Sequence, residues 1–317
     1  MSEKLENPFF SFVKYDPFLV DRSVNKKITP LIFSYNLDSW PAFSLWTPSF
    51  FKEKYGEQVV DVNPYLPDKT APYLHSMVSG TTSMRLGDFI DLMFTNKSVY
   101  LAEAPIDTFE GLKEHFNFTQ LVPPAEKGGK CWVSLWMGAN TRSGLHFDML
   151  DNFLVQIYGV KTFILIPPED IQLTYPIPSH FSKSPINPLN PDFKKFPKFK
   201  KAHIYQGELK PGDVLFIPKG WYHYLYAPQQ SISLNCFYGW PFTTQELLRI
   251  FFKSGWKSWI AAFKDFLWYG LFSRPYEGKL YCGLPFGKML YDRLTAHVKH
   301  LYCKYLIKSR PHFKEDR

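Results

Sequence analysis

The chain has few of the features that mark secreted, membrane-spanning or zinc-binding proteins. It has four cysteines in 317 residues, and no two of them have the Cys-x-x-Cys spacing of a zinc site or a redox pair. No run of 18 uncharged apolar residues exists that could form a transmembrane helix. The first residues lack the basic start and apolar stretch of a signal peptide. We therefore expect a cytoplasmic protein with reduced thiols.

The middle of the chain lacks long helical patterns. From Lys130 to Tyr238, short apolar runs alternate with Gly, Pro and Asn. This pattern predicts strands at 131–137, 152–158, 161–166, 214–217 and 231–238. Because no helix-length segment separates the strands, a doubly wound parallel sheet is disfavoured. We predict a mainly β fold whose core is a double-stranded β-helix, that is, a jelly-roll or cupin barrel.

The segments on either side of this core have different patterns. The N-terminal one mixes strand and helix signals, including a helix at 47–56 that Thr47 can cap. After residue 243 the spacing becomes helical, and one face would carry Leu247, Phe251, Trp259, Phe263 and Phe266. The predicted parts are an N-terminal α/β flanking part at 1–125, the barrel core at 126–243, and a C-terminal helical region at 244–317.

The net charge of +8 is concentrated in the C-terminal region. From Leu247 onward there are 14 Lys and Arg against 5 Asp and Glu, an excess of 9, so the first 246 residues carry −1. A solvated basic face is the simplest interpretation of this excess. The apolar face of the same helices predicts packing on the barrel, a homodimer contact, or both. Peripheral contact with an anionic membrane surface is a weaker alternative.

A His-x-Asp pattern at His146 and Asp148 is followed 75 residues later by His223. Residues two apart in a strand point to the same side, so His146 and Asp148 can reach one metal ion from one strand end. His223 follows the predicted strand at 214–217, which a barrel can place beside them. Two histidines and one carboxylate form the facial triad that holds Fe(II). The alternative is that these are partly buried histidines without a metal. This alternative becomes weaker when three residues of ligand type lie beside strands of one barrel.

Lys161 begins an otherwise apolar strand directly after a hairpin glycine. A lysine that faced into the barrel would be costly without a partner. A dicarboxylate bound through its distal carboxylate would neutralise it. The alternative is a Lys161 side chain that points outward into solvent.

Three segments resemble a known family. They are HFDMLDNFLVQIYGVKTFILIPP at 146–168, the Asn190-Pro191-Asp192 loop with FPKF at 196–199, and LKPGDVLFIP at 209–218 followed by Trp221-Tyr222-His223. In this order they resemble the JmjC/cupin-8 family of Fe(II)- and 2-oxoglutarate-dependent oxygenases, nearest to the branch with the HIF asparaginyl hydroxylase and the tRNA wybutosine hydroxylase. The resemblance covers about residues 28–240. Tyr222 and the Cys236-Phe237 pair depart from the branch, which concerns substrate shape rather than metal binding.

The resemblance implies a role for each matching residue. His146, Asp148 and His223 would bind iron, and Lys161 would pair with the distal carboxylate of 2-oxoglutarate. Other residues expected around the cosubstrate and the metal are Ser143, Tyr100, Asn152 and Asn235. For the two asparagines, local hydrogen bonding at strand edges is the alternative.

The implied activity is a dioxygenase that uses O2 to hydroxylate a macromolecule. We expect a protein side chain as the substrate. RNA is the second candidate, with the basic cluster Lys194, Lys195, Lys198, Lys200 and Lys201 following phosphates. For that cluster, a solvated loop is the simpler interpretation. N-methyl-lysine demethylation is third, and a non-catalytic cupin-like scaffold is the non-enzyme alternative.

Overall fold

The computed structural model describes residues 29–34, 37, 39–63, 81–95, 97–122, 129–276 and 284–308. By internal contacts the chain forms two compact units. The first comprises Met1–Pro176 and Ser182–Phe242, and the second comprises Ile177–Phe181 and Thr243–Arg317. The first unit contains every strand of the structure that is described, and the second is helical.

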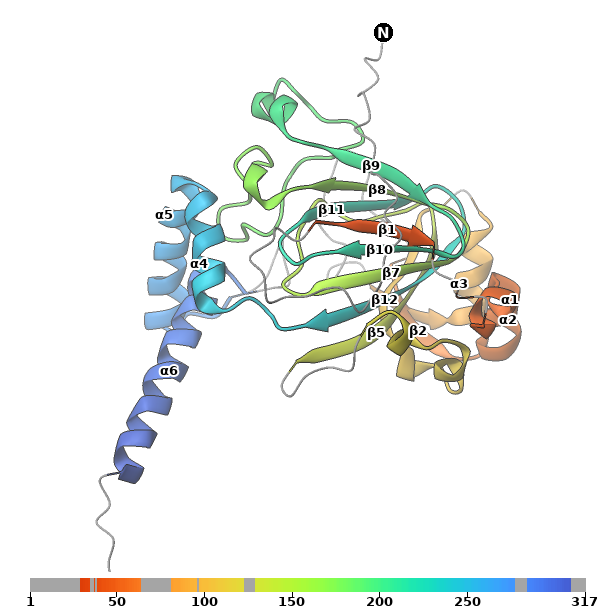
Figure 1. Cartoon of the computed structure of the whole chain (residues 1–317), viewed down its shortest axis with the longest axis horizontal. Helices are drawn as coiled ribbons and strands as arrows, with labels where there is room; N and C mark the ends of the chain where they lie inside the picture. The colour runs from red at the N-terminus through yellow and green to blue at the C-terminus, as the bar shows by residue number, and fades with distance from the viewer. Residues whose placement is uncertain are drawn as a thin grey trace, which may run out of the picture. The chain divides into compact units, whose positions relative to one another are not determined.

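Eight strands of the first unit form the jelly roll that the sequence predicted, so the mainly β fold class is confirmed (Figure 1). They are β5 (Lys130–Ala139), β6 (Thr141–Arg142), β7 (Asp151–Tyr158), β8 (Lys161–Ile166), β9 (Tyr205–Leu209), β10 (Asp213–Ile217), β11 (Tyr222–Ala227) and β12 (Ser231–Gly239). They pair antiparallel in two sheets. The smaller sheet has the order β6-β11-β8-β9, and the larger contains β10-β7-β12-β5.

Elements of the N-terminal part extend the larger sheet and cover it. β1 (Leu31–Ser34) adds beside β10, and β4 (Val99–Pro105) adds beside β5. β2 (Val59–Val62) and β3 (Thr82–Arg85) pair with each other. The helices of this part are α1 (Pro41–Leu45), α2 (Pro48–Tyr55), α3 (Leu86–Met93) and the 3-10 turns Ile106–Thr108, Leu112–His115 and Phe118–Gln120. Two further 3-10 turns, Pro168–Asp170 and Pro197–Lys201, lie between β8 and β9. α2 begins as predicted, because the Thr47 hydroxyl accepts a hydrogen bond from the Phe50 amide at 3.1 Å.

The larger sheet is buried on both faces. On β7, Phe153 and Val155 belong to a core that includes α2 and α3, whereas Leu154 belongs to a second core with Phe163 and Leu215 between the sheets. Alternate side chains of a strand point to opposite faces, so β7 fills both cores at once. This double burial explains why the strand appears in the sequence as a continuous apolar run.

The second unit contains α4 (Thr244–Lys253), α5 (Trp256–Asp265), a π-helical turn (Phe266–Leu271) and α6 (Phe286–Lys308). A capping box of Thr243 and Glu246 begins α4. The prediction that Leu247, Phe251, Trp259, Phe263 and Phe266 share one helix face is wrong. Gly255 has φ of 98° and separates α4 from α5, and Trp259 and Phe263 are 44% and 65% exposed while Leu247 and Phe251 are buried.

A large apolar surface lies on α4, α5 and the turn that follows. Its exposed members are Phe252, Trp256, Trp259, Ile260, Phe263, Trp268, Leu271 and Phe272. The predicted homodimer contact and the predicted membrane contact both fall on this surface, and both stay predictions. Among the described residues, no helix combines the length and the apolar character that crossing a membrane requires.

The hairpin between β7 and β8 depends on Gly159. Its φ is +72°, and an added Cβ would lie 2.0 Å from the carbonyl oxygen of Gln230. Gly212 is the matched control, because it has φ of +95° with nothing within 4 Å of its added Cβ. We expect Gly212→Ala to cost about 1–2 kcal/mol from backbone strain. Gly159→Ala should cost about 1–3 kcal/mol more from overpacking. Equal losses in urea unfolding would contradict this account of the hairpin.

Candidate metal and cosubstrate site

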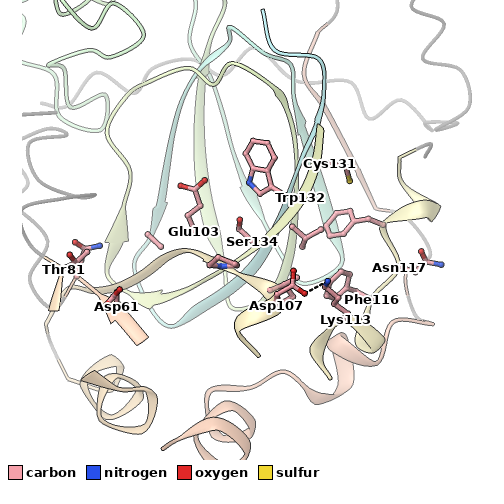
Figure 2. Close-up of a pocket in the computed structure, with 16 residues that line it drawn as sticks. Asp61, Thr81, Glu103, Asp107, Lys113, Phe116, Asn117, Cys131, Trp132 and Ser134 are labelled. Carbon is pink, nitrogen blue, oxygen red and sulfur yellow. Dashed lines mark ion pairs between the residues drawn. The ribbon is translucent and has the colours of Figure 1, made fainter. Parts of the chain in front are cut away.

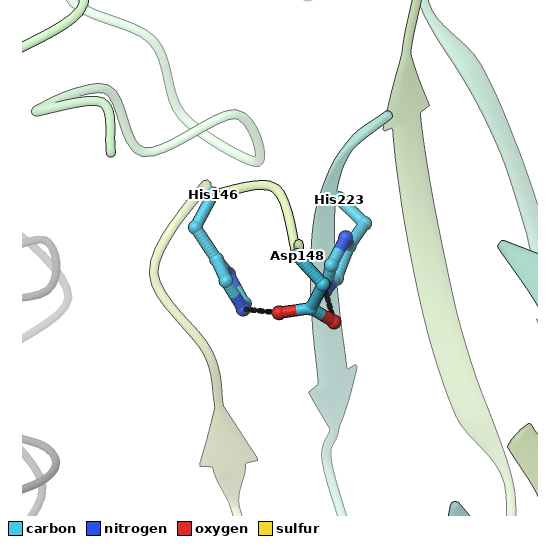
Figure 3. A group of neighbouring side chains, drawn as sticks. All are labelled: His146, Asp148 and His223. Atoms are coloured by element: carbon cyan, nitrogen blue, oxygen red, sulfur yellow. Dashed lines mark ion pairs between the residues drawn. The ribbon is translucent and has the colours of Figure 1, made fainter. Parts of the chain in front are cut away.

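The structure brings His146, Asp148 and His223 together (Figure 3). The Nε2 atoms of His146 and His223 lie 3.6 and 3.5 Å from the two carboxylate oxygens of Asp148. The expectation that His146 and Asp148 occupy one strand end is wrong, because both lie in irregular chain after β6. His223 follows β10 as predicted, and it lies within the next strand, β11. The three side chains nevertheless face one point.

Backbone hydrogen bonds hold this irregular segment against β11. The His146 amide donates to the His223 carbonyl at 3.1 Å, and the His223 amide donates back at 2.6 Å. The Gly220 amide donates to the Asp148 carbonyl at 3.1 Å. Because these bonds use main-chain atoms, they fix the backbone of the segment and leave the Nε2 atoms and the carboxylate uncommitted to backbone pairing.

The two imidazoles are oriented for metal binding. Nδ1 of His146 lies 2.8 Å from the Gly144 carbonyl, and Nδ1 of His223 lies 3.1 Å from the Trp221 carbonyl. A carbonyl only accepts, so each Nδ1 carries the proton and each Nε2 presents its lone pair towards Asp148. Burial, together with the neighbouring His223, lowers the pKa of His146 to about 4. The imidazole is therefore neutral near pH 7, which is the form that binds metals.

The two predicted asparagines lie beside the triad. Asn152 Nδ2 is 3.4 Å from the Asp148 carboxylate, and Asn152 Oδ1 accepts from Asn235 Nδ2 at 2.9 Å. The Oδ1 atom of Asn235 is buried and, within the described part of the chain, has no hydrogen-bond partner. A buried acceptor without a partner is costly. This atom therefore fits a site that a further polar group completes.

Lys161 points inward, as the dicarboxylate interpretation requires. Its side chain is buried, and its ammonium donates to the Ser233 hydroxyl of the opposite sheet at 2.6 Å. Among the described residues, no carboxylate pairs with it. Burial lowers the pKa of Lys161 from 10.5 to about 7. An anion would restore the charged form, since an opposite charge favours it.

Ser143 and Tyr100 line the same cavity as Lys161. The Ser143 hydroxyl oxygen accepts from the Leu225 amide at 2.9 Å, so its own proton remains available for donation. Tyr100 on β4 is buried, and burial raises its pKa, so the phenol stays protonated and can donate as well. The structure thus brings all eight sequence-predicted residues into one cavity of about 350 Å³.

Other lining residues carried no recognisable signal in the sequence. Among them are Glu103, Trp132, Trp136, Arg142 and Lys183. Glu103 lies where the pairing of β4 with β5 shifts register, and its φ is +52°. Burial and the Asp148 carboxylate raise the pKa of Glu103. Only the bulge, which depends on pairing with a distant strand, turns this side chain towards the cavity.

Two cysteines that sequence spacing did not pair lie side by side. The sulfur atoms of Cys131 on β5 and Cys236 on β12 are 3.6 Å apart. The Cys236 thiol lowers the pKa of Cys131 to about 7. Because 105 residues separate the two cysteines, only the pairing of β5 with β12 brings them together.

The low pKa of Lys161 generates a prediction for stability. Between about pH 7 and 10.5 the folded chain holds fewer protons at Lys161 than the unfolded chain, so the contribution of this group to stability rises with pH. The free energy of unfolding of the wild type relative to Lys161→Met should increase by about 2–3 kcal/mol from about pH 6 to about pH 9. Urea unfolding at both pH values measures this difference. A difference that does not change with pH would contradict a buried, uncharged Lys161.

Comparison with known proteins agrees with this geometry. Residues 17–244 match the family described as "Cupin-like domain". The chain is 28% identical over 262 residues to tRNA wybutosine-synthesizing protein 5 of Danio rerio, which covers 74% of this chain and 76% of that protein. It is 30% identical over 217 residues to Lysine-specific demethylase 8 of Danio rerio. This alignment covers 65% of this chain and 52% of that protein.

Other matches are shorter. Human HSPB1-associated protein 1 is 38% identical over 147 residues, which is 43% of this chain and 28% of that protein. The alignment with tRNA wybutosine-synthesizing protein 5 of Gallus gallus, at 34% identity, spans only 37% of that protein. The family match extends over most of this chain and includes every residue of the site. The chain belongs to the cupin-like family, and its predicted membership of the JmjC/cupin-8 group is confirmed.

Proposed function

We propose that this protein is an Fe(II)- and 2-oxoglutarate-dependent dioxygenase that hydroxylates a macromolecule, with a protein side chain as the substrate. One observation carries the proposal. A single cavity presents two histidines and a carboxylate that face one point, together with a buried ammonium that lacks a carboxylate partner among the described residues. The first group fits Fe(II), and the second fits one end of a dicarboxylate.

His146, Asp148 and His223 would hold the metal. Their ligand atoms lie within 4.8 Å of one another, and all three residues line the same cavity. Lys161 would bind the distal carboxylate, with Ser143 and Tyr100 as further donors. When bound, Fe(II) supplies the chemistry by which O2 and 2-oxoglutarate yield succinate, CO2 and an oxygen atom inserted into a C–H bond.

The chain itself positions the reactants and excludes water. Asn152 contacts the Asp148 carboxylate and is itself held by Asn235, and an apolar core that includes Leu154 and Phe163 packs between the sheets. Demethylation of an N-methyl group would follow from the same chemistry, because a hydroxylated N-methyl carbon leaves as formaldehyde. Hydroxylation is therefore the more general proposal. A non-catalytic scaffold would not need, in the cavity of the triad, a buried ammonium that lacks a carboxylate partner among the described residues.

RNA is the weaker substrate candidate. The cluster of Lys194, Lys195, Lys198, Lys200 and Lys201 is exposed, as expected of a solvated loop. Lys195 and Lys200 lie over the rings of Phe196 and Phe193, at 5.3 and 5.2 Å from the ring centroids. These rings are thus already covered by cations rather than open for stacking with bases. Among the described residues that line the cavity, none belongs to this cluster.

Succinate formation tests the enzyme class. The purified chain with Fe(II), ascorbate and 2-oxoglutarate should form succinate slowly even without a substrate. Asp148→Ala should lose this activity by at least about 100-fold, because it removes the anionic ligand. Asp91→Ala, at an exposed carboxylate that pairs with Lys52, should retain it. If the wild type neither binds iron nor forms succinate, only the scaffold alternative remains.

The substrate class has its own test. Cell lysate is incubated with the wild type or with Asp148→Ala, and the protein and RNA fractions are analysed by mass spectrometry. We expect peptides that gain the mass of one oxygen atom only with the wild type, because the proposed substrate is a protein side chain. Nucleosides that gain oxygen, with peptides unchanged, would instead support the RNA alternative.

A further inference from the structure

A second cavity, of about 720 Å³, is shown in Figure 2. It shares lining residues with the cavity that contains the triad, which we call the metal pocket. We refer to the second cavity as the outer groove. Ala102, Glu103 and Trp132 line both the outer groove and the metal pocket. A macromolecular substrate must reach the triad from solvent, and Lys161 is buried within the same cavity. The shared residues therefore flank a route from the outer groove to the triad.

The outer groove is acidic. Among its described lining residues, the charged side chains are Asp61, Glu103, Asp107 and Lys113, which is three carboxylates and one ammonium. Lys113 pairs with Asp107, and Asp61 accepts from the Ser83 hydroxyl at 2.6 Å. Within the described part of the chain, nothing hydrogen-bonds to Glu103 or pairs with it. Glu103 is thus the carboxylate at the junction of the two cavities that still lacks a partner.

Aromatic residues line the same two cavities as Glu103. Trp132 stacks on Phe237, its cross-strand neighbour, with ring centroids 5.1 Å apart and planes 27° from parallel. Trp132 is 39% exposed, whereas Phe237 is buried, so the stack leaves part of the Trp132 ring open. Glu103 and Trp132 both line the outer groove and the metal pocket, and Figure 2 draws both side chains above the Asp107–Lys113 pair in the view. A carboxylate next to a partly open indole is an arrangement that binds cations.

On the basis of the proposed function, we infer that the outer groove binds a basic segment of a protein, whose lysine or arginine side chain is recognised by the Glu103 carboxylate and the Trp132 ring. The positive φ of Glu103 supports a role in binding. A non-glycine residue in this conformation costs free energy, and here it turns a carboxylate into the junction of two cavities rather than into solvent.

The same charges disfavour RNA. Phosphates that approached along the outer groove would meet three carboxylates and a single ammonium that is already paired. Arg142 and Lys183 line the metal pocket but do not appear among the described residues of the groove. Like charges brought together at an interface weaken association, so a polyanion should be rejected where a polycation is accepted.

Binding of matched probes to the purified full chain tests this inference. Four fluorescein-labelled nonapeptides differ only at the central residue, which is lysine, arginine, glutamine or glutamate, and a labelled nine-nucleotide RNA is the polyanion probe. We expect the lysine or arginine peptide to bind about tenfold more tightly than the glutamine peptide in fluorescence anisotropy. The glutamate peptide and the RNA should bind more weakly than the glutamine peptide.

Variants link the preference to the two residues. Glu103→Gln should reduce the preference for the cationic peptide to less than about threefold, because only the charge is removed. Glu208→Gln, at an exposed carboxylate on β9, should keep the full preference. Trp132→Leu should weaken binding of the cationic peptide, and Trp132→Phe should restore part of it. Melting temperatures close to that of the wild type show that each variant is folded.

The inference is overturned if the cationic peptides show no preference, if Glu103→Gln leaves the preference intact, or if the RNA binds most tightly. The proposed function fails separately. A preference for cationic peptides that depends on Glu103, without succinate formation, would support the proposed binding site and contradict the proposed enzyme class. Succinate formation without a preference for cationic peptides would support the enzyme class and contradict the binding site.

Discussion

The paired backbone hydrogen bonds between His146 and His223 hold the rest of the site in place. They join an irregular segment to β11, and β11 is fixed in turn by its pairing with β8. Lys161 stands at the start of β8. The triad and the buried ammonium are therefore placed by one small sheet, and a shift of β11 by one residue would turn His223 to the other face.

The interior of the barrel is polar where the larger sheet faces the triad. On β12, Ile232, Leu234 and Cys236 belong to the core that includes α2 and α3. The residues between them, Ser233 and Asn235, therefore face the barrel interior. Ser233 meets Lys161, and Asn235 meets Asn152. An interior with these groups is costly when left incomplete. Strand alternation alone therefore places polar side chains in the barrel interior. A metal and a dicarboxylate would complete this set of polar groups.

The sequence predicted the parts of the site that depend on local order. The His-x-Asp spacing, the distant His223 and the lysine after Gly159 all occur in short, recognisable segments. It also predicted the strands of the larger sheet, because burial on both faces leaves long apolar runs. It could not show that Glu103 enters the cavity, since that depends on a bulge between β4 and β5. Nor could it show that Gly255 divides the C-terminal pattern into two helices, because helical spacing continues across the glycine.

The burial of Lys161 would make the proposed binding of a dicarboxylate a proton-coupled event. Because its pKa is about 7, near neutral pH a substantial share of ligand-free molecules carries an uncharged amine. A carboxylate pairs with the ammonium form, so a dicarboxylate that enters the barrel draws a proton from the buffer. Its affinity should then weaken steadily as the solution becomes alkaline. The same lysine that would bind the proposed cosubstrate would make the chain sense proton concentration in the buried interior of its barrel.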